Sequence, residues 1–115
     1  MDAEFIQPRY DSGGFASLPQ RIKASLLATP RKYDALVLIL VDGFGWRFFQ
    51  KFQNESFLKQ ISRMGQVEKL IAQFPSTTAA HLTTLHSGMP VGEHGIFEWY
   101  YYEPEIDALI APLLF

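Results

Sequence analysis

Two short stretches of this sequence carry the side chains best suited to chemistry. Asp42 comes directly after the apolar run Ala35–Val41, and three hydroxyl groups follow one another at Ser76, Thr77 and Thr78. A carboxylate next to so apolar a run is costly to bury unless it is paired or binds a metal ion. Hydroxyl groups at the start of a helix lie where unpaired backbone N–H groups favour an anion. The first stretch therefore suits a metal ligand, and the second suits a phosphate group.

Each stretch also has a purely structural interpretation. Asp42 can be a turn residue or the N-cap of the helix that follows it, because Gly43 lets the backbone turn at once. Ser76 or Thr77 can likewise be the N-cap of a helix predicted after Pro75. Residue type alone does not separate these roles from catalysis.

A threonine or serine hydroxyl cannot act as a nucleophile unaided, because its pKa is too high. The sequence lacks the Gly-x-Ser-x-Gly motif of serine hydrolases. His81, three residues after Thr78, could form a hydroxyl–imidazole pair with it; the other route is a metal ion, for which Asp42 is the nearest candidate ligand. Since the chain contains no cysteine, any metal must be held by oxygen and imidazole groups.

Both stretches follow a predicted β-strand. The run Ala35–Val41 has no polar alternation and predicts a strand buried on both faces, and Val67–Phe74 predicts a second strand that Pro75 ends. In open α/β sheets, ligands bind at the carboxyl ends of the strands. Asp42 and the three hydroxyl groups are therefore expected at that edge of the sheet.

Helices are predicted around these strands from apolar residues at helical spacing. The predicted helices span residues 20–27, 44–52, 55–64, 76–87 and 105–114. Asn54 is the expected N-cap of the third helix and Gly65 its stop, and Gly88 is the expected stop of the fourth. Pro90–His94 is predicted to be a loop, and Ile96–Tyr102 an aromatic strand.

The order strand, helix, strand, helix predicts an α/β fold with a mostly parallel sheet flanked by helices. Two or three strands are too few for a parallel sheet that is covered on both faces. We therefore expect residues 1–115 to be an N-terminal fragment of one larger domain. In this interpretation residues 1–32 form a leader loop with a short helix, and residues 33–115 begin the α/β core. The remainder of the same domain is then an expected partner.

Composition narrows the function further. A chain of 115 residues that is 48% hydrophobic and 15% aromatic is a folded protein, and so many aromatic residues need a large core or a partner. The formal charge of −2 gives no indication of nucleic-acid or membrane binding. The first residues are acidic rather than signal-like, and no apolar run approaches the roughly 20 residues that span a bilayer. A cytoplasmic location is expected.

Three segments, taken in order, resemble the type I phosphodiesterase/nucleotide pyrophosphatase family of the alkaline phosphatase superfamily. They are Leu38–Gly43, Phe74–Ala80 and Thr84–Ile96. Each segment alone is weakly specific, whereas their order and spacing together are fairly specific, and the resemblance extends over residues 33–98. It implies an alkaline phosphatase-like sandwich and a hydrolase that acts on small-molecule phosphate esters.

The resemblance also implies a site with two divalent metal ions, either zinc or manganese. In such a site Asp42 would be a metal ligand, and Thr78 would be both a metal ligand and the nucleophile that forms a phospho-threonine. Thr77 is the alternative nucleophile if the match to the family motif is shifted by one residue. Backbone N–H groups at Thr77 and Ala79 would bind the substrate. The family's further Asp and His ligands are expected beyond residue 115.

Two other functions stay open at this point. One is a phosphomonoesterase or a mutase of the same superfamily; a sulfatase is disfavoured because the chain has no cysteine for its modified nucleophile. The other is a non-catalytic module whose aromatic segment Phe97–Tyr102 docks a partner, although the same residues could pack inside a larger domain. A docking module should bind no stoichiometric zinc, which separates it from the enzymes.

Overall fold

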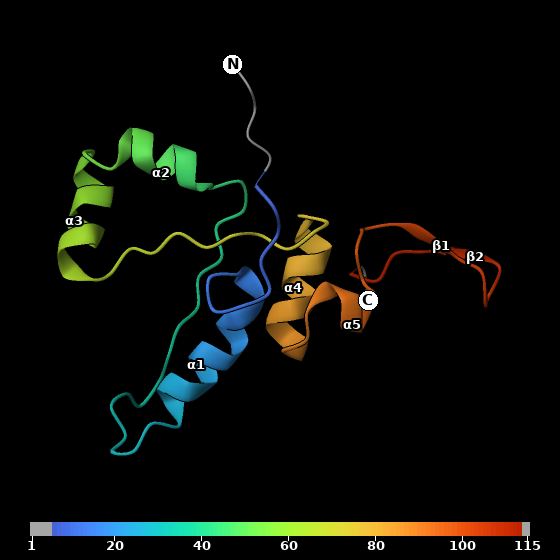
Figure 1. Ribbon diagram of the computed structural model, residues 1–115, viewed down its shortest axis with the longest axis horizontal. Helices are drawn as coiled ribbons and strands as arrows, with labels where there is room; N and C mark the ends of the chain where they lie inside the picture. The colour runs from blue at the N-terminus through green and yellow to red at the C-terminus, as the bar shows by residue number, and fades with distance from the viewer. Residues whose placement is uncertain (1–5, 114–115) are drawn as a thin grey trace. The chain divides into compact units, whose positions relative to one another are not determined.

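The structure, a computed structural model, describes residues 6–113 of the chain (Figure 1). These residues form two compact units. One is built from residues up to 36 together with residues from 70 onward, and the other from residues 37–69. The hydroxyl-bearing stretch belongs to the first unit and Asp42 to the second.

The first unit is a small helical cluster with a β-hairpin. It contains η1 (Phe15–Ser17), α1 (Leu18–Leu26), α4 (Thr78–Ser87), α5 (Val91–His94), β1 (Tyr101–Glu103) and β2 (Ala108–Ile110). Figure 1 shows α1 and α5 on either side of α4, and η1 and α1 both pack against α4. The longest helix of this unit, α4, is therefore its centre.

Local sequence signals set the ends of these helices. Pro19 lies in the first turn of α1, where a missing N–H costs nothing, so this helix begins two residues before the predicted residue 20. Helix α4 ends at Gly88, which has φ 75° and donates its N–H to the Thr84 carbonyl at 2.9 Å. The predicted stop at Gly88 is confirmed.

The second unit contains α2 (Trp46–Phe52) and α3 (Ser56–Met64), which confirms the helices predicted at 44–52 and 55–64 within two residues. The predicted N-cap at Asn54 is wrong, because Glu55 occupies that position. Gly65 follows the last residue of α3 as predicted. Gly45 is the N-cap of α2, so Asp42 is not its cap.

The predicted parallel sheet is not formed among residues 6–113, whose regular secondary structure is mostly helical. The segments Ala35–Val41 and Val67–Phe74 are not strands, and the second contributes a single parallel bridge between Ile71 and Gly14. An apolar run favours a buried strand, but it forms one only beside another strand that satisfies its backbone N–H and C=O groups. Within the described part of the chain, strand pairing is otherwise confined to the antiparallel hairpin.

The C-terminal predictions also need correction. Pro90–His94, predicted as a loop, contains the short helix α5. The strand predicted at Ile96–Tyr102 is wrong for most of its length, since β1 begins only at Tyr101. The helix predicted at 105–114 is wrong as far as residue 113, because β2 pairs with β1 in this region; Leu114 lies outside the described residues. Asp107 has φ 50° in the hairpin turn and accepts a hydrogen bond from the Tyr102 hydroxyl at 2.5 Å. This bond raises the pKa of Tyr102.

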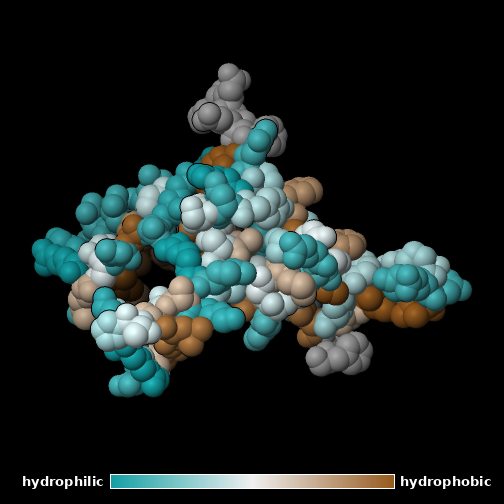
Figure 2. Space-filling model, turned by 60° about the horizontal axis from the view of Figure 1, so that its bottom comes forward, coloured by the Kyte–Doolittle hydropathy of each residue, from teal (hydrophilic) through white to brown (hydrophobic). Residues whose placement is uncertain are grey.

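The buried side chains are few and small. In the described part of the chain, the buried apolar side chains are those of Ala16, Ala79, Ala80 and Val91, and Gln73 and Thr84 are buried polar ones. Large hydrophobic side chains instead reach the surface, where Figure 2 shows them in brown at several places. Among residues 6–113, no helix is long and apolar enough to cross a membrane.

Candidate active site

The candidate active site begins where the chain enters α4. Thr77 is the N-cap of this helix, with extended backbone (φ −100°, ψ 155°). Its Oγ1 accepts the backbone N–H of Ala80 at 3.2 Å and donates to the carbonyl of Phe97 at 2.6 Å. The Thr77 hydroxyl is therefore committed to holding the helix start and to joining it to the chain 20 residues later. Of the two caps predicted for this helix, Ser76 and Thr77, the structure selects Thr77.

Thr78 and Ala79 occupy the first two positions of α4. The Thr78 side chain is half-buried, whereas Ala79 and Ala80 are both 0% exposed. The first N–H groups of any helix have no partner within that helix, and the dipole makes this end positive. Thr78 is thus a half-buried residue in the first turn of α4, the end of the helix that favours anions, and it is followed by two fully buried residues.

His81 braces the segment in front of α4. Its Nδ1 lies 2.8 Å from the Thr77 carbonyl, and its Nε2 lies 3.4 Å from the backbone N of Gln73. Because a backbone N–H can only donate, Nε2 is the acceptor and Nδ1 carries the hydrogen that is donated to Thr77. Both ring nitrogens of His81 therefore hold the backbone on either side of Pro75.

A buried polar network continues from Gln73, the residue whose N–H meets His81. Gln73, which is 2% exposed, donates through Nε2 to Thr84 Oγ1 at 2.8 Å and accepts the Val91 N–H at 2.8 Å. Thr84, 0% exposed, also lies 3.0 Å from His94 Nε2. His94 Nδ1 accepts the Ile96 N–H at 3.0 Å, so Nε2 carries the hydrogen donated to Thr84. The network ties α4, α5 and the strand-like segment before Pro75 into one piece.

Asp42 lies in the other unit, at an exposed turn. Its Oδ1 accepts the N–H of Gly43 at 2.8 Å, and Gly43 has φ 71°. The predicted turn at Asp42-Gly43 is therefore present. Thr77, Thr78 and Ala79 come together at one helix end, while the role of Asp42 stays a prediction.

The described residues do not by themselves fit a metal centre. Within residues 6–113, no group of three His, Asp or Glu side chains could hold a metal ion. Both nitrogens of His81 and of His94 are already used by hydrogen bonds inside the protein. A complete metal site would need ligands from elsewhere.

Sequence reasoning missed the buried Gln73–Thr84–His94 network. Its hydrogen bonds join residues 10, 11 and 18 positions apart, which no helical or strand spacing indicates. The one available signal was His94, which ends the predicted loop Pro90–His94; its Nδ1 accepts the Ile96 N–H.

Hydroxyl groups at the N-terminus of a helix suit a phosphate group or another anion. The sequence matches the family described as type I phosphodiesterase / nucleotide pyrophosphatase over residues 36–111, which is more than half of the chain. The chain therefore belongs to this family. Comparisons with curated proteins and with solved structures gave no significant match.

Proposed function

We propose that this chain carries the nucleophile of a phosphodiesterase or nucleotide pyrophosphatase, and that the nucleophile is Thr78. The observation that carries this proposal is the geometry of its neighbour. The Thr77 hydroxyl donates to Phe97 at 2.6 Å and caps Ala80, so it serves the structure of the helix start. Family membership over residues 36–111 supports a phosphate ester as the substrate.

In the proposed reaction, Thr78 Oγ1 attacks the phosphorus atom while the bond to the leaving alcohol or phosphate breaks. The hydroxyl proton passes to solvent, and the leaving group takes up a proton from solvent. Water then attacks the phospho-threonine, the bond between phosphorus and Oγ1 breaks, and the hydroxyl is restored. The two halves together consume one water molecule per ester bond.

The backbone of α4 is suited to hold the transferred phosphoryl group. The positive end of the helix dipole and the N–H groups of its first turn favour the negative charge of a phosphate. We assign the N–H groups at Thr77 and Ala79 to substrate binding, as the sequence predicts. Ala79 and Ala80 have no exposed surface in the structure, so substrate binding at the Ala79 N–H would require the chain that covers it to move aside.

We further propose that Asp42 and Thr78 are the metal ligands that this chain supplies to a pair of divalent ions, zinc or manganese. Such ions would lower the pKa of the hydroxyl and offset the charge of the phosphate. Two ligands are too few, so the remaining Asp and His ligands would come from sequence beyond residue 115. Two further predictions are untested: that residues 33–115 begin the α/β core of a larger domain, and that the protein is cytoplasmic.

The test is hydrolysis of bis(4-nitrophenyl) phosphate, with zinc or manganese present, by a chain that extends past residue 115. Thr78→Ala should lower kcat by roughly 10³-fold or more, because the nucleophile is lost. Thr83→Ala, also a half-buried threonine of α4, is the matched control and should keep kcat within about threefold of the parent. Full activity in Thr78→Ala would refute the assignment.

Thr77→Ala tests whether Thr78 or Thr77 is the nucleophile. Loss of the N-cap should cost about 1 kcal/mol of stability while catalysis persists. Equal loss of kcat in Thr77→Ala and retention in Thr78→Ala would assign the nucleophile to Thr77 instead. Residues 1–115 alone should show no turnover, and turnover that a chelator abolishes in that chain would contradict the proposal of missing ligands.

A further inference from the structure

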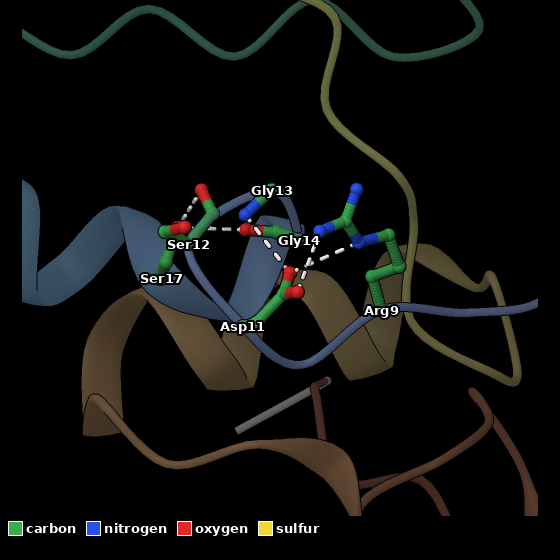
Figure 3. A network of polar contacts seen from close by, with 6 residues as sticks. All are labelled: Arg9, Asp11, Ser12, Gly13, Gly14 and Ser17. Carbon is green, nitrogen blue, oxygen red and sulfur yellow. Dashed lines mark hydrogen bonds and ion pairs between the residues drawn. The ribbon is translucent and has the colours of Figure 1, made fainter.

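From here on, the name leader loop is restricted to residues 9–17. They lie outside the segment that matches the family, yet η1 within them packs against α4. The loop is held by its own polar contacts, as Figure 3 shows. The guanidinium of Arg9 pairs with the Asp11 carboxylate through Nε at 3.0 Å and Nη2 at 2.5 Å. Asp11 Oδ1 also accepts the Gly13 N–H at 3.0 Å, and Ser17 Oγ donates to the Gly14 carbonyl at 2.8 Å. The loop is thus held in part by polar contacts among its own residues.

The backbone of the leader loop is joined to the segment before Pro75. Phe15 donates its N–H to the Ile71 carbonyl at 2.8 Å, and Ile71 donates its N–H to the Gly13 carbonyl at 3.0 Å. These two bonds form the parallel bridge between Gly14 and Ile71. The loop is therefore in register with the chain that leads to the candidate nucleophile.

Two aromatic side chains of the loop, Tyr10 and Phe15, contact residues near the candidate nucleophile. The Tyr10 hydroxyl donates to the Phe74 carbonyl at 3.4 Å and accepts the Phe74 N–H at 3.3 Å. The rings of Phe15 and His81 meet edge to face, with centroids 4.3 Å apart and planes at 90°. Tyr10 thus holds the backbone immediately before Pro75, and Phe15 holds the ring of His81.

His81 transmits the contact of Phe15 to the helix start. Its Nδ1 lies 2.8 Å from the carbonyl of Thr77, the residue directly before Thr78. The orientation of the ring fixes which nitrogen meets Thr77 and which meets Gln73. A ring that loses its packing against Phe15 is free to rotate, and the Thr77 carbonyl then loses a donor.

From these contacts we infer that the leader loop is a positioning element for the nucleophile: Tyr10 and Phe15 fix the backbone of residues 74–78 from outside the family segment. This inference rests on the proposed role of Thr78. Neither Tyr10 nor Phe15 touches the reacting atoms in this assignment. They act by holding the hydroxyl in the geometry needed for attack, where a displacement of about 1 Å can cost roughly 10²-fold in rate.

The first experiment uses the 115-residue chain and does not depend on catalysis. Tyr10→Phe removes one hydroxyl group, and Phe15→Leu removes the ring that contacts His81. Nitrogen chemical shifts should assign the Nδ1–H tautomer to His81 in the parent chain. Phe15→Leu should shift this ring toward a mixture of tautomers, and Tyr10→Phe should speed amide hydrogen exchange at Phe74 by about tenfold.

Matched controls separate these effects from general loss of stability. Tyr33→Phe removes an exposed tyrosine hydroxyl, and Phe57→Leu trims an exposed phenylalanine of α3. Both controls should leave the His81 tautomer and the Phe74 exchange rate unchanged. An unchanged His81 tautomer in Phe15→Leu, together with an unchanged exchange rate in Tyr10→Phe, would overturn the inference.

The second experiment measures hydrolysis of bis(4-nitrophenyl) phosphate in a chain that extends past residue 115. Phe15→Leu should lower kcat by about 10- to 100-fold with KM unchanged, since it alters positioning rather than binding. Equal kcat in parent and Phe15→Leu would contradict the inference even if the tautomer changes. If Thr78→Ala keeps full activity, the proposed function fails, whereas the spectroscopic result on the loop still stands.

Discussion

Helices α3 and α4 are similar in length but differ in what they bury. Helix α3 has a strongly apolar face, yet its Phe57, Ile61 and Met64 are 71%, 44% and 80% exposed. Helix α4 has a much weaker apolar face, yet Ala79, Ala80 and Thr84 are all 0% exposed. The less amphipathic helix is thus the better packed one.

The difference lies in how each helix finds its neighbours. Small side chains such as those of Ala79 and Ala80 let other segments approach the helix closely. Hydrogen bonds from Gln73 and His94 to Thr84 then fix which segments these are, because a buried polar group left without a partner is costly. An apolar face specifies no particular neighbour, since the hydrophobic effect is non-directional. Four predictions test this contrast.

The largest effect is expected at the centre of the buried network. Thr84→Val keeps the shape of the side chain but leaves the Gln73 amide and the His94 ring N–H without an acceptor. The free energy of unfolding should fall by about 2 to 4 kcal/mol, as measured by urea denaturation. Thr83→Val on the same helix should cost less than about 1 kcal/mol. Equal losses in the two variants would show that the hydrogen bonds of Thr84 do not account for the stability of α4.

A smaller loss is expected from crowding the same helix. Ala80→Leu adds three carbon atoms at a site with no exposed surface and should cost about 1 to 3 kcal/mol in the same measurement. Ala24→Leu in α1 adds the same atoms at an exposed site and should stay within about 0.5 kcal/mol of the parent. A neutral Ala80→Leu would show that α4 is loosely packed.

On α3 the contrast predicts almost no change. Phe57→Ser removes a large ring, but most of that ring is already in contact with water, so stability should change by less than about 0.5 kcal/mol. A loss above about 2 kcal/mol would mean that the apolar face of α3 is covered in solution. It would contradict the conclusion that α3 is less well packed than α4.

The smallest effect is expected at the leader loop, whose ion pair is exposed rather than buried. Hydrogen bonds from Arg9 hold the pKa of Asp11 below its usual range. A lowered folded-state pKa stabilises the loop above the unfolded pKa of about 4, and this stabilisation disappears as the pH falls through the folded value. In Arg9→Gln the titration midpoint of Asp11, followed by NMR, should rise, whereas Arg31→Gln should not move it.

The fold could be predicted from sequence where the signal was local. Thr77 caps a donor three residues away and Gly88 stops the helix it follows, so both ends of α4 could be read from neighbouring residues. The strand at Ala35–Val41 was wrong, because an apolar run does not say which strand lies beside it. The helix at 105–114 was wrong because Ala108–Ile110 pairs with Tyr101–Glu103, and three consecutive apolar residues do not indicate that pairing.

The candidate site divides in the same way. Sequence indicated Thr77 and Thr78 because three hydroxyl groups at a helix start are conspicuous in themselves. It did not indicate Gln73 or Tyr10, whose partners lie 11 and 64 residues away in the chain. Contacts of that kind depend on tertiary packing, and a single sequence shows only the residue type at each end.

The polar pairings around α4 and α5 have a consequence for how the protein folds. Four hydrogen bonds join residues within the range 73–97, over separations of 10 to 20 residues. They link Thr84 with His94, Gln73 with Thr84, Gln73 with Val91, and Thr77 with Phe97. Contact order is therefore low in this region, and short loops close at little entropic cost. We therefore expect α4 and α5 to form their contacts early in folding, and more distant parts of the chain to pack against them later.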